Sequence, residues 1–243
     1  MKHRKTKTIL IILVSILLLT TVVGCIYIND YYRANQTALS MLGSDENVTV
    51  RVTDDQVVFI PDEPTVGFIF YPSGKVEHTA YSPLLRSLAE QGILCILVEM
   101  PFRLAVLDMN AAMGIPAQYA EIDDWYIGGH SLGGSMAAIH AAENDDMYDG
   151  LVLLASYSTA DISESGMDVI SVYGTEDHVM NPEKYENYFG NLPESTKEVI
   201  IEGGCHAYFG SYGPQEGDGV PTITVEEQTQ ETVDLLVEFF PIK

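Results

Sequence analysis

Residues 125–138 carry the sequence WYIGGHSLGGSMAA. The first four residues are apolar or small and predict a buried strand, and the alanine-rich continuation from Leu132 predicts a helix. Between them, Gly129 to Gly133 fit the pattern G-x-S-x-G. Small residues around Ser131 allow a sharp turn that exposes its hydroxyl, next to a helix N-terminus that stabilises negative charge. A glycine-rich turn with an incidental serine is the alternative, but the flanking strand and helix favour a nucleophile.

The rest of the body alternates apolar runs with helix-like stretches. Apolar runs occupy residues 66–71, 93–98, 125–128, 151–155, 168–173 and 198–201, and the stretches with helical character occupy 81–91, 102–120, 132–143, 182–189 and 225–240. This alternation predicts an α/β fold, with a mostly parallel central sheet and helices on both faces. Residues 47–53 and 56–60 flank the turn at Asp54 and Asp55, which predicts an N-terminal β-hairpin. We expect one domain over residues 47–243.

A serine nucleophile needs a base, and the base needs an orienting acid. His206 and Asp177 each follow a predicted strand, and ligands of parallel sheets bind at that edge. His178 is expected to shape its loop. Glu176 and Glu99 stay open as alternative acids, although Glu99 is more simply explained as half of a structural ion pair.

The order Ser131, Asp177, His206 is that of the α/β-hydrolase fold. The segments FYPSGKV (70–76), GGHSLGG (128–134), YGTED (173–177) and GGCHAYFG (203–210) resemble a group of compact bacterial serine hydrolases, related in outline to dienelactone hydrolases and small carboxylesterases. The resemblance covers nearly all of residues 48–241 and implies a triad of Ser131, Asp177 and His206. Dienelactone hydrolases use a cysteine nucleophile where this chain has Ser131, so their substrate is not carried over.

An oxyanion hole needs two N–H donors, one of which is expected from Leu132, the residue after the nucleophile. The other should come from the loop after the strand 66–71. Many family members have His-Gly there, whereas this chain has Tyr71 and Pro72, and proline lacks an N–H. Ser73 is therefore the first candidate and Gly74 the second.

No cap domain is expected after the strand 151–155. The dozen residues 156–167 are mostly small and polar, and they are too few to form a cap with its own core. Such an open site has few apolar walls, and an acyl chain gains only about 0.8 kcal/mol for each CH₂ that finds one. We therefore expect short acyl esters to be hydrolysed better than long ones, with no activation at a lipid interface.

The charge excludes one class of partner. The chain has 12 Lys and Arg against 35 Asp and Glu, a formal net charge of −23, and four of the basic residues lie in the first seven positions. The acidic body would repel phosphate backbones, so no nucleic-acid partner is expected. The 3 cysteines make no disulfide framework, and no Cys/His cluster predicts zinc, so neither metal nor organic cofactor is expected.

The first residues predict a membrane segment. A basic flank at 1–7 precedes an uncharged run at 8–28, long enough for a bilayer core, and 29–46 are expected to form a stalk. The positive-inside rule would keep the flank cytoplasmic and send the domain outside. Two alternatives remain: residues 22–25 resemble a lipobox that would make Cys25 a lipid anchor, or the segment is a cleaved signal peptide.

These observations together predict a membrane-anchored extracytoplasmic serine hydrolase. The substrate would be a small acyl compound with a carboxylic ester, thioester or lactone bond, cleaved through an acyl-enzyme. An acyltransferase using the same triad is one alternative, and a non-catalytic binding protein on this scaffold is the other. The oligomeric state stays open.

Overall fold

The computed structural model describes residues 2–242, with the side chains of residue 7 and residues 12–242. The chain forms two compact units that meet at Tyr31 and Tyr32. The first unit contains the helix α1 (Lys2–Asn29). Within the described part of the chain, α1 is the one helix whose length and composition suit a membrane span, with a mean hydropathy of 2.3 over Ile12–Asn29. A signal sequence would meet the same criterion.

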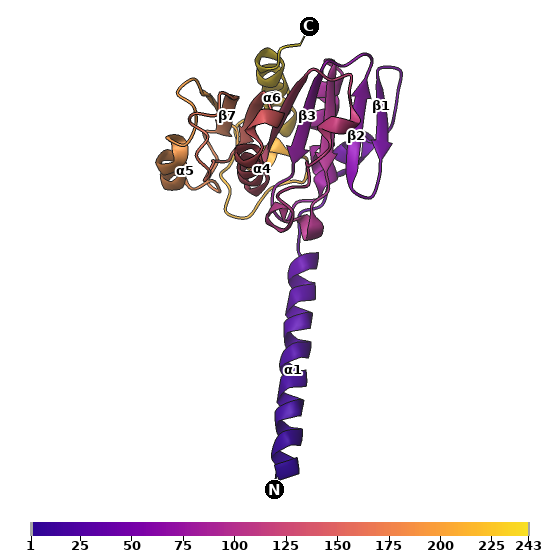
Figure 1. The fold of residues 1–243 in the computed structure, drawn as a ribbon, viewed down its shortest axis with the longest axis vertical. Coiled ribbons are helices and arrows are strands. Elements are labelled where there is room, and N and C mark those ends of the chain that lie inside the picture. The colour runs from indigo at the N-terminus through magenta and orange to yellow at the C-terminus, as the bar shows by residue number, and fades with distance from the viewer. Residues whose placement is uncertain (1, 243) are drawn as a thin grey trace. The chain divides into compact units, whose positions relative to one another are not determined.

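The second unit is built on an eight-stranded sheet. Its strands are β1 (Val48–Val52), β2 (Gln56–Pro61), β3 (Val66–Tyr71), β4 (Ile93–Val98), β5 (Asp124–His130), β6 (Gly150–Leu154), β7 (Asp168–Gly174) and β8 (Lys197–Ile201). Their order in the sheet is β1-β2-β4-β3-β5-β6-β7-β8 (Figure 1). The pairs β1–β2 and β2–β4 are antiparallel, and all other pairs are parallel. The predicted hairpin and mostly parallel sheet are confirmed.

The central strands are buried on both faces, as continuous apolar sequences predict. Every residue of β3, β4 and β6 is buried. Gly67 of β3 lies so close to the Trp125 ring that no side chain would fit there. Because the central strands run parallel, β3 to β8 all end at one edge of the sheet, which receives the loops that carry the candidate site.

Helices cover both faces. One face packs against α3 (Ser82–Ala89) and α6 (Val225–Phe239), and the other packs against α4 (Leu132–Glu143), α5 (Pro182–Phe189) and the segment 105–122. Phe68 and Tyr126 of the sheet contact the Phe240 ring at centroid distances of 5.3 Å and 4.8 Å. Between β6 and β7 the described chain forms no cap, in agreement with the sequence.

The helical stretch expected over 102–120, with breaks at Gly114 and Pro116, is wrong. The structure has three single turns of 3₁₀-helix there instead, at Pro101–Arg103, Ala105–Leu107 and Pro116–Gln118. Phe102 and Arg103 have positive φ angles, which lie outside the right-handed helical region, whereas the positive φ of Gly114 agrees with the break expected there. The buried Tyr71 hydroxyl also bonds to the Met109 carbonyl and the Ala112 N–H, which ties the segment to the end of β3.

The segment expected to be a stalk contacts the body from Tyr32 onward. Tyr32 forms a β-bridge with Val76, and the Asn35 N–H donates to the Ser211 carbonyl over 2.9 Å. Asn35 caps the short helix α2 (Gln36–Ser40), whose Ala38 is fully buried. Arg86 pairs with Asp45 and binds the Met41 carbonyl, so residues 32–46 are packed on the domain.

Candidate active site

Ser131 stands between β5 and α4 with φ 54° and ψ −122°. This backbone conformation is rare for a residue with a side chain, and its strain is typical of a functional turn. The turn is held on both sides: the Ser131 N–H donates to the Leu154 carbonyl, and the Ser156 hydroxyl donates to the Ser131 carbonyl. The structure thus has the strand, turn and helix that the G-x-S-x-G pattern predicts.

The glycines around Ser131 are required by close backbone approaches. A side chain on Gly129 or Gly133 would collide with the Tyr71 carbonyl oxygen at the end of β3. A side chain on Gly134 would collide with the Gly129 carbonyl and with Ser156. The turn therefore lies directly against the loop that follows β3.

His206 and Asp177 form a buried pair. His206 Nδ1 lies 2.9 Å from Asp177 Oδ2, and each side chain is only 1% exposed. The other carboxylate oxygen, Asp177 Oδ1, accepts the N–H groups of Val179 and Met180 at 2.9 and 2.8 Å. Both oxygens are therefore used, which fixes the carboxylate so that it orients the imidazole.

The backbone around His206 is held by two side chains that the sequence analysis did not single out. Gln228 of α6 is fully buried and binds both backbone groups of Cys205, accepting from the N–H at 2.9 Å and donating to the carbonyl at 2.8 Å. Asp218 accepts the N–H groups of Ala207 at 2.8 Å and His206 at 3.3 Å. Because these partners are 11 to 23 residues away in sequence, no local pattern could have indicated them.

His130 connects the serine turn to the histidine loop. Its ring centroid lies 4.4 Å from that of His206, and its Nδ1 lies 2.8 Å from Tyr81 Oη. Burial, reinforced by the neighbouring His206, holds the pKa of His130 well below its usual value, so the ring is neutral. His206 Nε2 is buried and has no hydrogen-bond partner among the described residues. This nitrogen is the one that a general base would use.

The expected oxyanion donors differ in their availability. Leu132 is the first residue of α4, where helix N–H groups lack helical acceptors. The Ser73 N–H, by contrast, donates to Tyr81 Oη over 3.2 Å. A side chain on the neighbouring Gly74 would touch the Leu132 side chain, so Gly74 lies directly beside the residue after Ser131. The geometry favours Gly74 over Ser73 as the second donor.

A pocket of about 230 Å³ opens beside Ser131. It is lined by Ser131, Leu132, Ser135, Ala155, Ser156, Tyr157, Val179, Met180 and Asn181. Its walls come from the loops after β5, β6 and β7, and its size suits a small acyl group.

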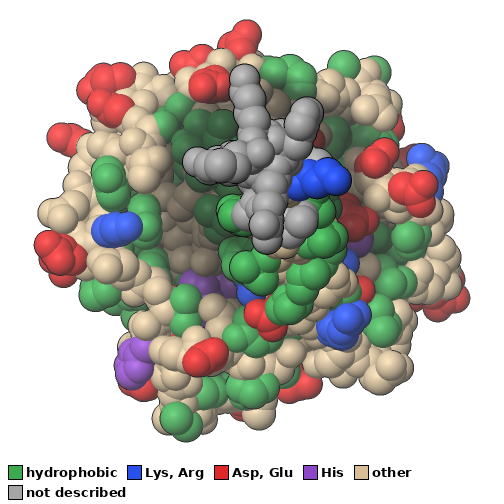
Figure 2. Space-filling view, turned by 90° about the horizontal axis from the view of Figure 1, so that it is seen from below, with side chains coloured by type: hydrophobic (Ala, Val, Ile, Leu, Met, Phe, Trp, Pro, Cys, Tyr) green, Lys and Arg blue, Asp and Glu red, His purple; other side chains and the backbone are tan. Residues whose placement is uncertain are grey.

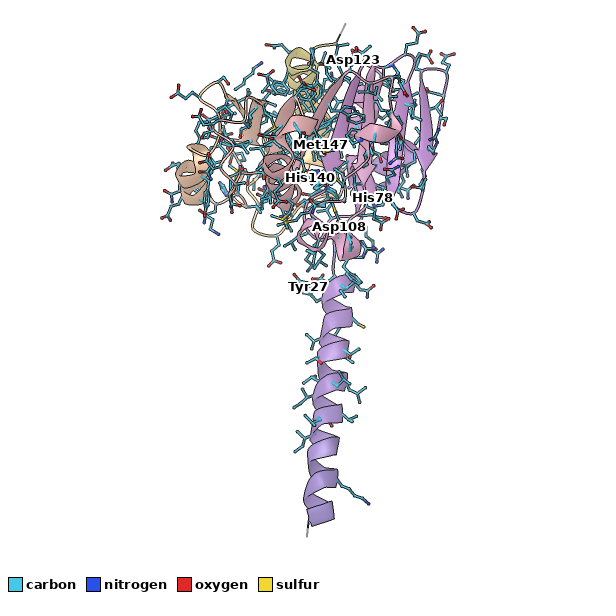
Figure 3. All side chains as sticks on the ribbon, viewed as in Figure 1. Tyr27, His78, Asp108, Asp123, His140 and Met147 are labelled. Carbon is cyan, nitrogen blue, oxygen red and sulfur yellow. The ribbon has the colours of Figure 1, made fainter. Side chains whose placement is uncertain are left out.

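The other nucleophiles and acids are not arranged for catalysis. Burial, with a further contribution from Asp218, raises the pKa of the Cys205 thiol to about 12, so it stays protonated. His178 is exposed, and Glu99 lies 3.9 Å from His78 Nδ1. The buried His140, labelled in Figure 3, bonds to Asn110 and Tyr148, which is a structural role. Within the described residues, no three His, Cys, Asp or Glu side chains are grouped as metal ligands.

The sequence from Gly67 to Gln230 matches the model of the alpha/beta hydrolase family, and this match covers more than half of the chain. The chain belongs to the α/β-hydrolase family. The sheet order, the serine turn and the loops after β7 and β8 agree with this membership. A search of curated proteins gave no significant match.

Several solved structures share the α/β-hydrolase fold of the chain. A dienelactone hydrolase from Anabaena variabilis is 14% identical with a TM-score of 0.57, covering 79% of this chain and 99% of its own. Carboxyl esterase 2 from the fungus Tuber melanosporum is 10% identical with a TM-score of 0.55, covering 86% and 89%. An alpha/beta hydrolase from a Moroccan lagoon metagenome is 15% identical with a TM-score of 0.58, covering 79% and 97%. At these identities the likeness concerns the fold.

Proposed function

We propose that this α/β-hydrolase cleaves carboxylic ester-type bonds through an acyl-enzyme on Ser131. The observation that carries the proposal is the buried pair of His206 and Asp177 beside the strained serine turn, with His206 Nε2 lacking any hydrogen-bond partner, Ser131 included, among the described residues. This arrangement supplies a nucleophile, a base and an orienting acid within one site.

In the proposed reaction, His206 Nε2 takes the Ser131 proton as the hydroxyl attacks the acyl carbon. Asp177 keeps the imidazole in the tautomer that carries its proton on Nδ1 and stabilises the imidazolium. The N–H groups of Leu132 and Gly74 stabilise the tetrahedral oxyanion, and His206 then protonates the leaving alcohol. Water, activated by the same histidine, resolves the acyl-enzyme and releases the acid.

A serine-directed fluorophosphonate tests this assignment. The probe should label the full-length chain in detergent, and Ser131→Ala should abolish labelling. Ser135→Ala is the matched control, because this hydroxyl lines the same pocket and donates to the Tyr157 carbonyl. Labelling that survives Ser131→Ala would move the nucleophile elsewhere.

We further propose that α1 anchors the enzyme in a membrane, with the basic flank in the cytoplasm and the hydrolase domain outside. The supporting observation is the apolar window Ile12–Asn29, which is long enough to span the hydrocarbon core. Cys25 is exposed on this helix, which keeps lipid attachment at this residue as the second possible mode of anchoring.

A further inference from the structure

We propose that the substrate is a short-chain acyl ester carried by a membrane-resident molecule, and that the edge of the domain with the candidate site lies on the outer membrane surface. This inference rests on the hydrolase activity and the membrane anchor proposed above. It names where the substrate resides and which residues of the domain contact the lipid.

The first observation is the place where the chain joins the domain. Tyr32 is the first residue of the second unit. Its N–H donates to the Lys75 carbonyl over 2.8 Å, just beyond Ser73 and Gly74 in the loop after β3. Its hydroxyl accepts the Glu216 N–H at 3.0 Å, and its ring lies 5.5 Å from that of Tyr212, in the loop that follows His206. Tyr32 therefore lies between the two loops that flank the candidate site.

The second observation is the length of the connection. Helix α1 ends at Asn29, so only residues 30 and 31 separate it from Tyr32. The three Cα–Cα steps from residue 29 to residue 32 span at most about 11 Å when extended. If α1 crosses the membrane, this tether holds the edge at Tyr32 close to the lipid headgroups.

The third observation is an apolar surface on a segment of the same edge, which we call the docking segment (residues 102–113). Phe102, Val106, Leu107 and Met113 are each at least half exposed, at 57, 50, 56 and 53%. Large apolar side chains exposed together on one segment indicate a contact surface, and interfacial membrane binding buries such side chains at the headgroup boundary. Because α1 is joined to this edge of the domain by a short tether, the partner that we infer for the docking segment is a lipid bilayer.

The docking segment is fixed to the candidate site. The Lys75 N–H donates to the Arg103 carbonyl over 2.9 Å, and the Leu104 side chain would lie 3.8 Å from a side chain on Gly74. Asp108 in this segment and His78 after β3 both lie on the lower side of the domain in Figure 3. Lipid contact at the docking segment would therefore bring a bilayer-resident ester to the oxyanion loop.

The charged side chains on this edge of the domain decide which kind of lipid headgroup it can approach. Arg33 follows Tyr32, Lys75 is bonded to Tyr32 through its carbonyl, and Arg103 is bonded to Lys75, although the sequence from residue 29 onward contains only eight basic residues. Seen from below in Figure 2, most acidic side chains lie toward the rim of this face. Asp54, Asp55, Glu99 and Asp108 nevertheless line a cavity of about 690 Å³, and Phe102 and Met113 of the docking segment line the same cavity. Because these acids repel anionic lipid, docking has to come from the apolar side chains, and a zwitterionic bilayer is the appropriate probe.

The acyl group itself must be short. The pocket beside Ser131 has a volume of about 230 Å³, and Ser135, Ser156 and Asn181 contribute polar groups to its wall. The apolar part that holds the substrate in the membrane is therefore the alcohol. Hydrolysis adds water across the ester bond, so the short acid leaves in water and the alcohol stays in the bilayer.

The test compares two acetates that share the acyl group and differ in location. The full-length chain is reconstituted in phosphatidylcholine vesicles with either hexadecyl acetate in the bilayer or p-nitrophenyl acetate in water. We expect F102D/L107D to lower kcat/KM for hexadecyl acetate by about tenfold or more, because both substitutions oppose interfacial insertion. For p-nitrophenyl acetate the change should stay within about twofold, as for ordinary surface substitutions.

Ile242→Asp is the matched control, since this exposed apolar residue follows α6 near the C-terminus, which Figure 1 marks at the upper end of the domain. It should leave both rates within about twofold of wild type. Wild-type hydrolysis of hexadecyl acetate by F102D/L107D would overturn the inference, and an equal loss on both acetates would also count against it.

A second measurement does not depend on activity. Phe102→Trp should be quenched by brominated phosphatidylcholine, whereas Ile242→Trp should not, with the buried Trp125 of the wild-type chain as the background. Equal quenching of the two variants, or none, would overturn lipid docking. Failure of the proposed function has a different signature: p-nitrophenyl acetate hydrolysis would persist in Ser131→Ala while the quenching result stands by itself.

Discussion

At the scale of single residues, the carboxylate of Asp177 is the most constrained group of the site. One oxygen faces His206 Nδ1 and the other accepts two backbone N–H groups. In Asp177→Asn, the amide NH₂ replaces one carboxylate oxygen, so a donor would face either His206 Nδ1–H or the two backbone N–H groups. The histidine would then adopt the wrong tautomer or rotate, and kcat should fall by about 10⁴-fold.

Steady-state kinetics with circular dichroism as a folding check would measure this loss. The loss should be smaller than that of His206→Ala, which removes the base altogether. Glu176→Gln is the control, because it changes the neighbouring carboxylate and should retain activity. Full activity of Asp177→Asn would assign the acid to Glu176 or Glu99.

How well single residues can be predicted depends on whether their partners are local. Ser131, Asp177 and His206 follow strands, so the sequence alone could propose them as the triad. Tyr81 could not be found in this way, because its bonds to Ser73 and His130 span 8 and 49 residues. The bond from the Ser73 N–H to Tyr81 also explains why the geometry favours Gly74 over Ser73, the first candidate from the sequence, as the proposed second oxyanion donor.

At the scale of elements, α6 acts on the site through Gln228. Replacing this side chain by alanine would leave the buried N–H and carbonyl of Cys205 without partners. Each such group costs about 1–3 kcal/mol, so Gln228→Ala should lower the free energy of unfolding by about 2–6 kcal/mol. Because Cys205 precedes His206, kcat should fall as well.

Chemical denaturation and steady-state kinetics on the same preparation would measure both effects. Gln230→Ala is the matched control, since Gln230 lies two residues on in the same helix and makes an exposed bond to Asp234. It should change the free energy of unfolding by no more than about 0.5 kcal/mol. An unchanged stability in Gln228→Ala would show that water replaces the amide.

Elements were predicted well where periodicity and burial agree, as in the central strands and α4. The segment 102–120 was predicted wrongly because its composition is helical while its contacts are not. Tyr71, 38 and 41 residues away, binds Met109 and Ala112, and positive φ angles at Phe102 and Arg103 turn the backbone. Tertiary contacts of this kind override local propensity.

At the scale of the whole molecule, buried histidines predict how stability depends on pH. Burial lowers the pKa of His78, His130 and His140 in the folded chain. The unfolded chain therefore binds more protons below about pH 6.5, and stability should fall as the pH decreases, by up to about 1.4 kcal/mol per unit for each histidine.

Calorimetric Tm values between pH 7.5 and 5 would measure how steeply stability falls with pH. Most carboxylates titrate below this range, so they contribute little to the change. In His140→Gln the slope should be shallower, although this variant starts from a lower Tm because its bonds to Asn110 and Tyr148 are altered. A constant Tm over this range would contradict the prediction.

The proposed topology is also a property of the whole chain. Protease added to intact spheroplasts should digest the hydrolase domain, because the basic flank at 1–7 keeps the N-terminus inside. Protection of the domain would contradict this orientation. Cys25→Ala separates the two modes of anchoring: loss of membrane attachment or of lipid labelling in this variant would favour a lipoprotein.

The short connection between β6 and β7 is a place where sequence could be inserted during evolution. The buried side chains of Ile162 and Met167 hold this connection against the core. Glu164 and Gly166 between them are exposed, and a side chain at Gly166 would meet no other atoms. Such a tip tolerates inserted sequence, since lengthening a loop costs little entropy, about 0.6 kcal/mol for each doubling. Ser156 and Tyr157 at the start of the same connection line the pocket. A lineage could therefore acquire a lid, and with it a new substrate range, by one insertion that leaves the sheet and the turn at Ser131 untouched.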